Sequence, residues 1–360
     1  MNGPSRMDWI ARRAVLGACV LGSHALTLYA QPTAPPDPDP QAPRPASTSN
    51  ARQGVGLRVP EGVKALRDLV YARVDDRELK LDLYLPASAQ PAEGHKPEDI
   101  APVPLIVWVH GGGWRGGTKA VCPALPLTAK GFAAASVEYR FVQDATFPAQ
   151  IHDCKGAIRW LRANADKYRL DPERIGVWGA SAGGHLVALL GTSAGVENAE
   201  GDVGGNPTFS SRVNAVCDWF GPTDLVAILG PDAANADPDN GGRLPPAGTL
   251  VTDLMGCWPK KCADLYRLAN PISFASKDDP PFLIMHGDAD PLVPLAQSEA
   301  LHAALEKSGV RSRLHVVKGH KHTSFRGADL DMVGAFFEAE LRPSAPAHPP
   351  AEKRKDSDKQ

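Results

Sequence analysis

The stretch Gly176-Val177-Trp178-Gly179-Ala180-Ser181-Ala182-Gly183-Gly184 places a serine inside the pattern Gly-x-Ser-x-Gly. The sequence predicts a short buried strand at residues 174–178 and a helix rich in small side chains at 182–190. A serine at such a sharp strand-to-helix turn takes a strained backbone conformation that exposes its hydroxyl above the edge of the sheet. The pattern alone also fits a plain glycine-rich turn. Its position between a strand and a helix favours a nucleophilic serine.

A nucleophilic serine also needs hydrogen-bond donors for an oxyanion, and a glycine-rich loop upstream offers them. The apolar run at residues 104–109 predicts a buried strand, which leads into His110-Gly111-Gly112-Gly113-Trp114. Consecutive glycines can turn their backbone N–H groups toward a developing oxyanion, and the residue after the nucleophile supplies a further donor. The expected donors are the N–H groups of Gly112, Gly113 and Ala182.

Acid and base candidates follow two further predicted strands. A strand at residues 281–285 leads to Asp288 and Asp290, and a last strand at 314–317 leads to a short segment that holds His320 and His322. The chain order is therefore serine, aspartate, histidine, which is the order of α/β-hydrolases and not that of chymotrypsin-type or subtilisin-type enzymes. The residue pattern leaves two candidates for the acid and two for the base.

Residues 68–341 resemble the α/β-hydrolase esterases related to bacterial feruloyl and acetyl-xylan esterases and to the hormone-sensitive-lipase group. The matching phrases are His110-Gly111-Gly112-Gly113-Trp114, Glu138-Tyr139-Arg140 and the segments 147–153, 179–186, 220–225 and 286–294. The resemblance implies an α/β-hydrolase fold: a mostly parallel central sheet with helices on both faces and a lid-like insertion. In the family pattern His-Gly-x-x-Asp the acid is Asp290, and the histidine after Gly-x-x is His322, although Thr323 follows where the family commonly has glycine.

The resemblance implies a secreted serine carboxylesterase without a cofactor. Its expected substrates are small-molecule or carbohydrate esters of short acyl groups or aromatic acids, with esters on plant polysaccharides among them. Four aromatic residues follow predicted strand ends and are candidates for lining the substrate pocket, with a core role as the alternative for each. They are Trp114, Tyr139, Trp219 and Phe220.

Three other classes of protein compete with this interpretation. The segment 111–116 also satisfies the dinucleotide pattern G-x-G-x-x-G, but a nicotinamide-dependent oxidoreductase would leave Ser181, Asp290 and His322 unexplained. A prolyl-oligopeptidase-like peptidase shares the triad, yet this chain lacks room for the propeller that accompanies it. A catalytically inactive binding protein with the hydrolase fold is the third alternative.

The sequence has no His-Glu-x-x-His or Cys-x-x-Cys pattern, so we expect no metal site.

Composition and the N-terminal residues predict an exported protein. The chain has 39 basic and 41 acidic residues, which gives no reason to expect nucleic acid as a partner. Arg6, Arg12 and Arg13 precede an apolar run at residues 14–30 that is too short and interrupted for a stable membrane span. We expect an export signal at 1–30 and a periplasmic or extracellular location. The adjacent Arg12 and Arg13 also fit a twin-arginine signal, and the sequence leaves the Sec and twin-arginine routes open. A lipoprotein site at Cys19 is the weaker alternative.

The remaining chain divides into a linker, one catalytic domain and a tail. Residues 31–54 and 342–360 are rich in proline and polar residues and are expected to be disordered, while 55–341 forms the catalytic domain with an insertion at about 225–271. The insertion is expected to form a lid or pocket wall. Further elements are expected as strands at 69–74, 79–85, 132–138 and 213–219 and as helices near 119–130, 149–165 and 332–341.

Cysteine placement offers two disulfides. Cys257 and Cys262 can close a small loop in the insertion, and Cys122 with Cys154 is a second candidate pair. Cys217 has no evident mate, and connectivity does not follow from sequence.

Overall fold

The computed structural model describes residues 58–91, 96, 99–230, 244 and 246–342. All of them belong to the unit Val55–Gln360 of the chain. The expected export signal (1–30), the linker (31–54) and, apart from Arg342, the tail (342–360) lie outside the described residues. Among the described residues, no helix is long and apolar enough to cross a membrane.

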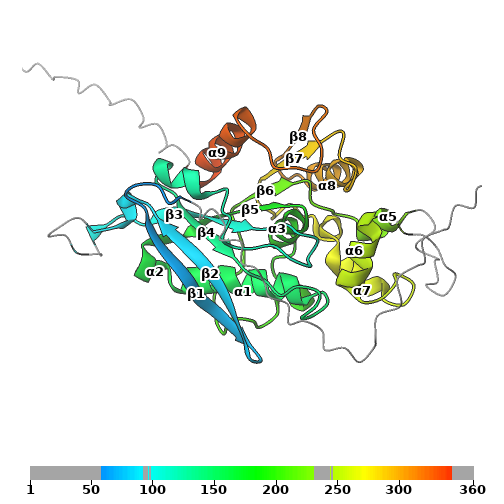
Figure 1. Ribbon diagram of the computed structural model, residues 1–360, viewed down its shortest axis with the longest axis horizontal. Helices are drawn as coiled ribbons and strands as arrows, with labels where there is room; N and C mark the ends of the chain where they lie inside the picture. Colours follow the sequence, from blue (N-terminus) through cyan, green and yellow to red (C-terminus); the bar gives the residue numbers. More distant parts are fainter. Residues whose placement is uncertain (1–57, 92–95, 97–98, 231–243, 245, 343–360) are drawn as a thin grey trace, which may run out of the picture. The chain divides into compact units, whose positions relative to one another are not determined.

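An eight-stranded sheet runs through this unit in the order β1-β2-β4-β3-β5-β6-β7-β8 (Figure 1). Its strands are β1 Lys64–Val74, β2 Arg77–Leu85, β3 Val103–Val109, β4 Ala133–Val137, β5 Leu170–Ala180, β6 Ala215–Trp219, β7 Phe282–Gly287 and β8 Ser312–Val317. β2 pairs antiparallel with β1 and with β4, and the other neighbouring strands are parallel. The predicted α/β fold with an antiparallel starting pair is confirmed.

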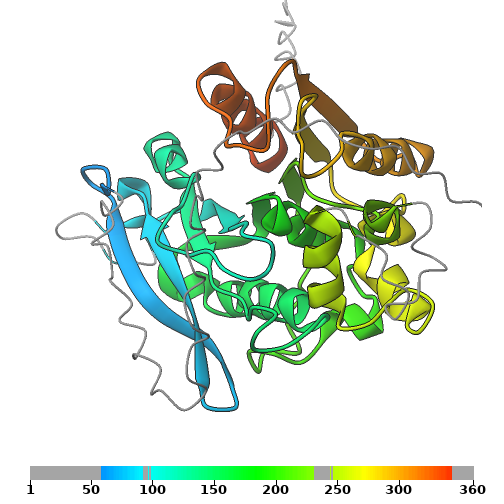
Figure 2. The ribbon, with the colours of Figure 1, turned by 45° about the vertical axis from the view of Figure 1, so that its right-hand side comes forward.

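Helices cover both faces of the sheet (Figures 1 and 2). They are α1 Ala149–Ala163, α2 Ala165–Tyr168, α3 Ala182–Thr192, α4 Glu197–Glu200, α5 Leu225–Leu229, α6 Pro246–Met255, α7 Ala263–Ala269, α8 Ala296–Lys307 and α9 Ala328–Leu341. Short 3₁₀ helices are η1 Ala87–Ala89, η3 Leu125–Lys130 and η5 Pro271–Phe274.

The central strands are apolar on both faces because each face is packed. In β3, Val107 and Val109 join the core formed with α1, α3 and α8, while Ile106 and Trp108 join the core formed with η3 and α9. Successive side chains of a strand point to opposite faces, so a strand buried on both sides is a continuous apolar run. This burial holds the carboxyl ends of the parallel strands at one edge, where the loops of the site begin.

Two expected elements differ in the structure. The helix expected at 119–130 is wrong over its first part, since only η3 is helical there. Pro123 and Pro126 explain the difference because proline lacks the N–H that an α-helix requires. The aperiodic stretch at 225–271 contains α5, α6 and α7, which pack against the core through scattered side chains such as Leu254 and Tyr266.

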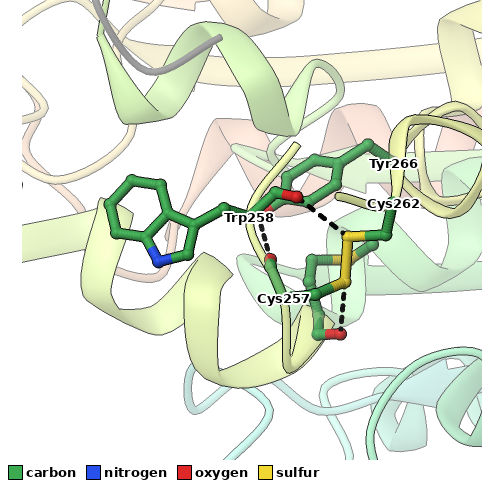
Figure 3. The surroundings of a disulfide bond; sticks show 5 residues. Cys257, Trp258, Cys262 and Tyr266 are labelled. Atoms are coloured by element: carbon green, nitrogen blue, oxygen red, sulfur yellow. Dashed lines mark hydrogen bonds between the residues drawn. A yellow bond between two sulfur atoms is a disulfide. The ribbon is translucent and has the colours of Figure 1, made fainter. Parts of the chain in front are cut away.

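One of the two candidate disulfides is present. Cys257 and Cys262 are bonded, and the Tyr266 hydroxyl donates a hydrogen bond of 3.1 Å to the Cys257 carbonyl oxygen beside the bond (Figure 3). The candidate pair Cys122 and Cys154 is wrong: both are buried free thiols. Cys122 packs in the core on the η3 and α9 face, whereas Cys154 packs in the core on the α1 and α3 face, so the sheet separates them.

Candidate active site

Ser181 stands at the turn between β5 and α3 in a conformation that is unusual for a residue with a side chain. Its backbone angles are φ 55° and ψ −121°, and its N–H donates a hydrogen bond of 2.8 Å to the Trp219 carbonyl oxygen of β6. A Cβ on Gly183 would collide with the Val109 carbonyl oxygen at the end of β3, so glycine is required for α3 to lie this close. Positive φ at a serine costs free energy that the surrounding packing must supply. The turn therefore fixes the hydroxyl above the sheet edge.

The structure brings Ser181, His322 and Asp290 together. His322 Nε2 lies 2.9 Å from Ser181 Oγ, and His322 Nδ1 lies 2.6 Å from Asp290 Oδ2. The side chain of Asp290 is 1% exposed and that of His322 is 16% exposed. Because a carboxylate oxygen can only accept, Nδ1 carries the imidazole proton, and the unprotonated Nε2 faces the serine hydroxyl. This arrangement is that of a serine nucleophile, a general base and an orienting acid.

The other two candidates lie outside this chain of hydrogen bonds. Asp288 is exposed, and its carboxylate accepts a hydrogen bond from the Gly319 N–H. His320 Nε2 donates to the Thr323 carbonyl oxygen at 3.0 Å, and its ring stacks on Phe325. Both residues therefore shape the loops that carry Asp290 and His322.

Asp290 is held in its ionised form. Burial works to raise the pKa of this carboxyl, but hydrogen bonds from His286 and His322 and from the N–H groups of Val293 and Leu292 outweigh burial and hold its pKa well below the ordinary value. The two backbone donors bind Oδ1 at 2.8 and 3.0 Å. A fixed negative charge at Asp290 stabilises the imidazolium that His322 becomes when it takes a proton.

The expected oxyanion donors border the same space. Gly112 and Gly113 have φ angles of 113° and 60°, which turn the loop after β3 over the site, and both line one cavity with Ser181. Within the described part of the chain, no hydrogen bond uses the N–H of either glycine. Ala182 begins α3, where the first N–H groups of a helix have no partner inside the helix. All three N–H groups are thus candidates for binding an oxyanion.

A cavity of about 560 Å³ opens above Ser181 and is mostly apolar with a polar side. Its side-chain walls include Trp108, Val121, Phe220, Leu250 and Leu292, with Thr118, Thr323 and Ser324 as the polar side. A larger cavity of about 920 Å³ is lined by residues of β1, α1 and the segment 202–206 and contains none of the catalytic candidates. We therefore take the smaller one as the substrate cavity.

Of the four aromatic pocket candidates, only Phe220 lines this cavity. Trp114 packs edge-on against His185, Tyr139 donates a hydrogen bond to the His110 carbonyl oxygen, and Trp219 packs edge-on against Trp178. All three are buried in the cores. Trp114 and Tyr139 lie in the loops after β3 and β4, and Trp219 is the last residue of β6. The side chains of all three turn into the sheet packing instead of the open edge.

Sequence reasoning missed several wall residues and one neighbour of the acid. Leu292 stands inside the quoted phrase 286–294, so its place beside Asp290 was a usable signal, whereas Leu250 comes from an aperiodic stretch that gave none. His286 stands in the same phrase, and its Nε2 lies 3.3 Å from Asp290 Oδ2.

The dinucleotide alternative lacks the local structure that it requires. The glycine pattern at 111–116 is followed by turns instead of the helix N-terminus that a dinucleotide site requires. Among the described residues, no group of three histidine, cysteine, aspartate or glutamate side chains is placed to hold a metal ion.

Comparison with known proteins identifies the family. The BD-FAE family profile matches residues 81–305. This chain belongs to the BD-FAE family. The resemblance to α/β-hydrolase esterases inferred from the sequence is thereby confirmed.

Relatives of this BD-FAE member include esterases of known structure. A truncated carbohydrate esterase from gut microbiota has a TM-score of 0.65 at 32% identity, with 77% of this chain and 96% of that chain covered. The propionate-bound esterase Est2 of Thermogutta terrifontis has a TM-score of 0.58 at 27% identity, with 79% and 98% covered. Esterase LipQ of Mycobacterium tuberculosis is 33% identical over 237 residues, which are 63% of this chain and 52% of LipQ. The chain spans about half the length of the curated relatives it matches.

Proposed function

We propose that this BD-FAE family member is a serine carboxylesterase that hydrolyses short-chain acyl or aromatic-acid esters, including esters on carbohydrates. One observation carries the proposal: the hydrogen-bonded series from Asp290 Oδ2 to His322 at 2.6 Å and from His322 to Ser181 Oγ at 2.9 Å. Acyl transfer also needs an exposed nucleophile and donors for the oxyanion. The strained turn under Ser181 supplies the first, and the glycine loop beside it offers the second.

Acylation begins when Ser181 Oγ attacks the ester carbonyl carbon while its proton passes to His322 Nε2. The carbonyl oxygen becomes an oxyanion and accepts hydrogen bonds from the N–H groups of Gly112, Gly113 and Ala182. Asp290 stays ionised and balances the charge of the imidazolium. The tetrahedral intermediate then breaks its bond to the alcohol oxygen, which takes the proton from His322 and leaves.

Deacylation repeats the same steps with water. His322 takes a proton from a water molecule that attacks the acyl carbonyl of the ester on Ser181. The second tetrahedral intermediate releases the carboxylic acid as Oγ recovers its proton from His322. The enzyme returns to its starting state without any co-reactant.

The cavity supports a small acyl group and a polar alcohol. Its walls hold apolar side chains such as Phe220 and Leu292 beside the hydroxyl groups of Thr118, Thr323 and Ser324. Solved relatives are described as a carbohydrate esterase and as Est2 with propionate or butyrate bound. An ester that joins a short acid to a sugar hydroxyl fits this cavity, because its acyl group suits the apolar side chains and its sugar suits the hydroxyl groups.

A panel of esters tests the proposal. We would measure hydrolysis of p-nitrophenyl esters from acetate to decanoate and of methyl ferulate by wild type, by Ser181→Ala and by a control, Ser210→Ala, whose serine is exposed and outside the cavity. We expect activity on short or ferulate esters in wild type and control, and its loss in Ser181→Ala. No hydrolysis of any ester by wild type, or activity that survives Ser181→Ala, would contradict the assignment.

We also propose that the protein is exported. The support is the basic and then apolar character of residues 1–30 and the disulfide between Cys257 and Cys262, a bond typical of oxidising compartments. Fractionation of cells that express the full chain tests this, with Arg12→Lys/Arg13→Lys as the variant. Retention of only the double variant in the cytoplasm would identify the twin-arginine route, and cytoplasmic wild type would refute export.

A further inference from the structure

A second histidine lies behind the acid. His286, the fifth residue of β7, is fully buried and places Nε2 3.3 Å from Asp290 Oδ2, the oxygen that also accepts from His322. The same Nε2 lies 2.9 Å from the Val293 carbonyl oxygen. Both neighbours of Nε2 are acceptors, so this nitrogen must carry a proton.

Ser298 of α8 accounts for the tautomer. Its hydroxyl oxygen lies 2.7 Å from His286 Nδ1, and its side chain is fully buried. With the proton of a neutral imidazole on Nε2, Nδ1 is an acceptor, and the Ser298 hydroxyl is its donor. Ser298 therefore holds His286 in the form that presents an N–H to Asp290.

The same histidine also closes the turn around the carboxylate. Val293 donates its N–H to Asp290 Oδ1 at 3.0 Å and accepts from His286 Nε2 through its carbonyl oxygen. His286 thus contacts both the carboxylate and the backbone that wraps it. A buried imidazole costs more free energy than an apolar side chain unless its polar atoms are used, and here both nitrogens are used.

We propose that His286 is a positioning residue for the ester hydrolysis proposed above: its Nε2–H, held in that tautomer by Ser298, keeps Asp290 Oδ2 aligned with His322. The inference rests on the proposed function, because it assigns His286 a role in orienting the base during proton transfer. Without this contact Oδ2 keeps only His322 as a donor, and the Val293 carbonyl oxygen loses the hydrogen bond from His286 of β7.

Four variants and one background test the role. His286→Leu removes the donor, His286→Gln keeps an N–H at a similar reach, and Ser298→Ala removes the tautomer lock. His302→Gln is the matched control, because His302 Nδ1 also contacts a serine oxygen, that of Ser312 at 2.9 Å, and this pair lies outside the cavity. His286→Leu is measured again in the Asp290→Asn background. Values of kcat and KM on p-nitrophenyl butyrate are taken per folded protein, checked by near-ultraviolet circular dichroism.

The expected loss lies in kcat. Because a misplacement of about 1 Å can cost about 100-fold in rate, we expect His286→Leu to lower kcat by about 10- to 100-fold at nearly constant KM. His286→Gln should recover most of the lost kcat. The kcat of Ser298→Ala should lie between those of His286→Leu and His286→Gln, and the kcat of His302→Gln should match wild type. In the Asp290→Asn background, His286→Leu should lower kcat by less than about twofold, since the residue through which it acts is already altered.

Other results would overturn the role. Wild-type kcat in folded His286→Leu, failure of folded His286→Gln to recover activity, or an equal loss in the Asp290→Asn background would each do so. If His286→Leu does not fold, Ser298→Ala carries the test, and an unchanged kcat there refutes the proposal. Failure of the esterase assignment itself is separate, because it appears as an inactive wild type or an active Ser181→Ala before any His286 variant is measured.

Discussion

Leu250 packs against Gly113: both methyl carbons of the leucine lie 3.1 Å from the position that a Cβ would take on the glycine. Leu250 belongs to α6 of the insertion, whereas Gly113 belongs to the loop after β3. Both residues line the cavity above Ser181. The insertion therefore supplies a wall directly beside an expected oxyanion donor.

Shortening this wall should change acyl selectivity. Leu250→Ala opens room beside Gly113, so we expect the ratio of kcat/KM for hexanoate to that for acetate to rise by about tenfold, the effect of one or two methylene groups in an apolar pocket. The measurement is kcat/KM across p-nitrophenyl esters. Leu268→Ala, on α7 and outside the cavity, is the control. An equal change in the control would show that the effect comes from loosening the insertion.

The two aspartates of the loop after β7 should differ sharply in kinetics. Asp290→Asn is expected to lower kcat by about 10⁴-fold, because an amide favours the wrong histidine tautomer. Asp288→Asn should leave kcat within a few-fold, since its exposed carboxylate contacts the Gly319 N–H and not the histidine. Steady-state rates at pH 8 measure both. A large loss in Asp288→Asn with little in Asp290→Asn would reverse the assignment of the acid.

Asp218 should make stability depend on pH. This side chain is fully buried in β6 and accepts a hydrogen bond from the Gly221 N–H at 2.9 Å, and burial raises its pKa from 3.8 to about 6. Between these pH values the native state keeps a proton that the unfolded state loses. The free energy of unfolding contributed by Asp218 is therefore fully present below pH 3.8 and is lost as pH rises through about 6.

A neutral replacement isolates this contribution. A pKa change from 3.8 to about 6 corresponds to about 3 kcal/mol. Asp218→Asn cannot ionise, so its free energy of unfolding relative to wild type should rise by about 3 kcal/mol between pH 4 and pH 8. Urea denaturation at several pH values measures the difference. A difference that stays constant with pH would show that Asp218 ionises normally in the fold.

The disulfide should stabilise the end of α6. Because the loop from Cys257 to Cys262 is short, chain entropy assigns the bond about 2 kcal/mol. We expect Cys257→Ser/Cys262→Ser to lower Tm and to raise KM, since Leu250 lies on the same helix. Reductant should lower the Tm of wild type and leave that of the double variant unchanged. An unchanged Tm in the double variant would mean that the surrounding contacts suffice.

Much of the site followed from local patterns. Neighbouring residues alone were enough to recognise three features: the turn at Ser181, the glycine loop at 111–113, and the strand ends before Asp290 and His322. Parallel strands place their carboxyl ends at one edge, so the order of these segments brought the candidates to the same place. Sequence reasoning failed where a side chain could turn to either face, as with Trp219, which packs into the core and not into the cavity.

The sequence by itself determined the strand-to-helix turn at Ser181, the glycine-rich loop at 111–113 and the serine–aspartate–histidine order, because these depend on backbone conformation and chemistry over a few residues. Only the tertiary structure decided that Leu250 walls the cavity, that His286 backs Asp290 and that Cys122 and Cys154 lie across the sheet from one another. Two of these relationships join residues far apart in the chain. His286 and Asp290 are only four residues apart, but the orientation of the His286 ring depends on Ser298 of α8. All three arise from how helices and strands pack, which no short segment encodes.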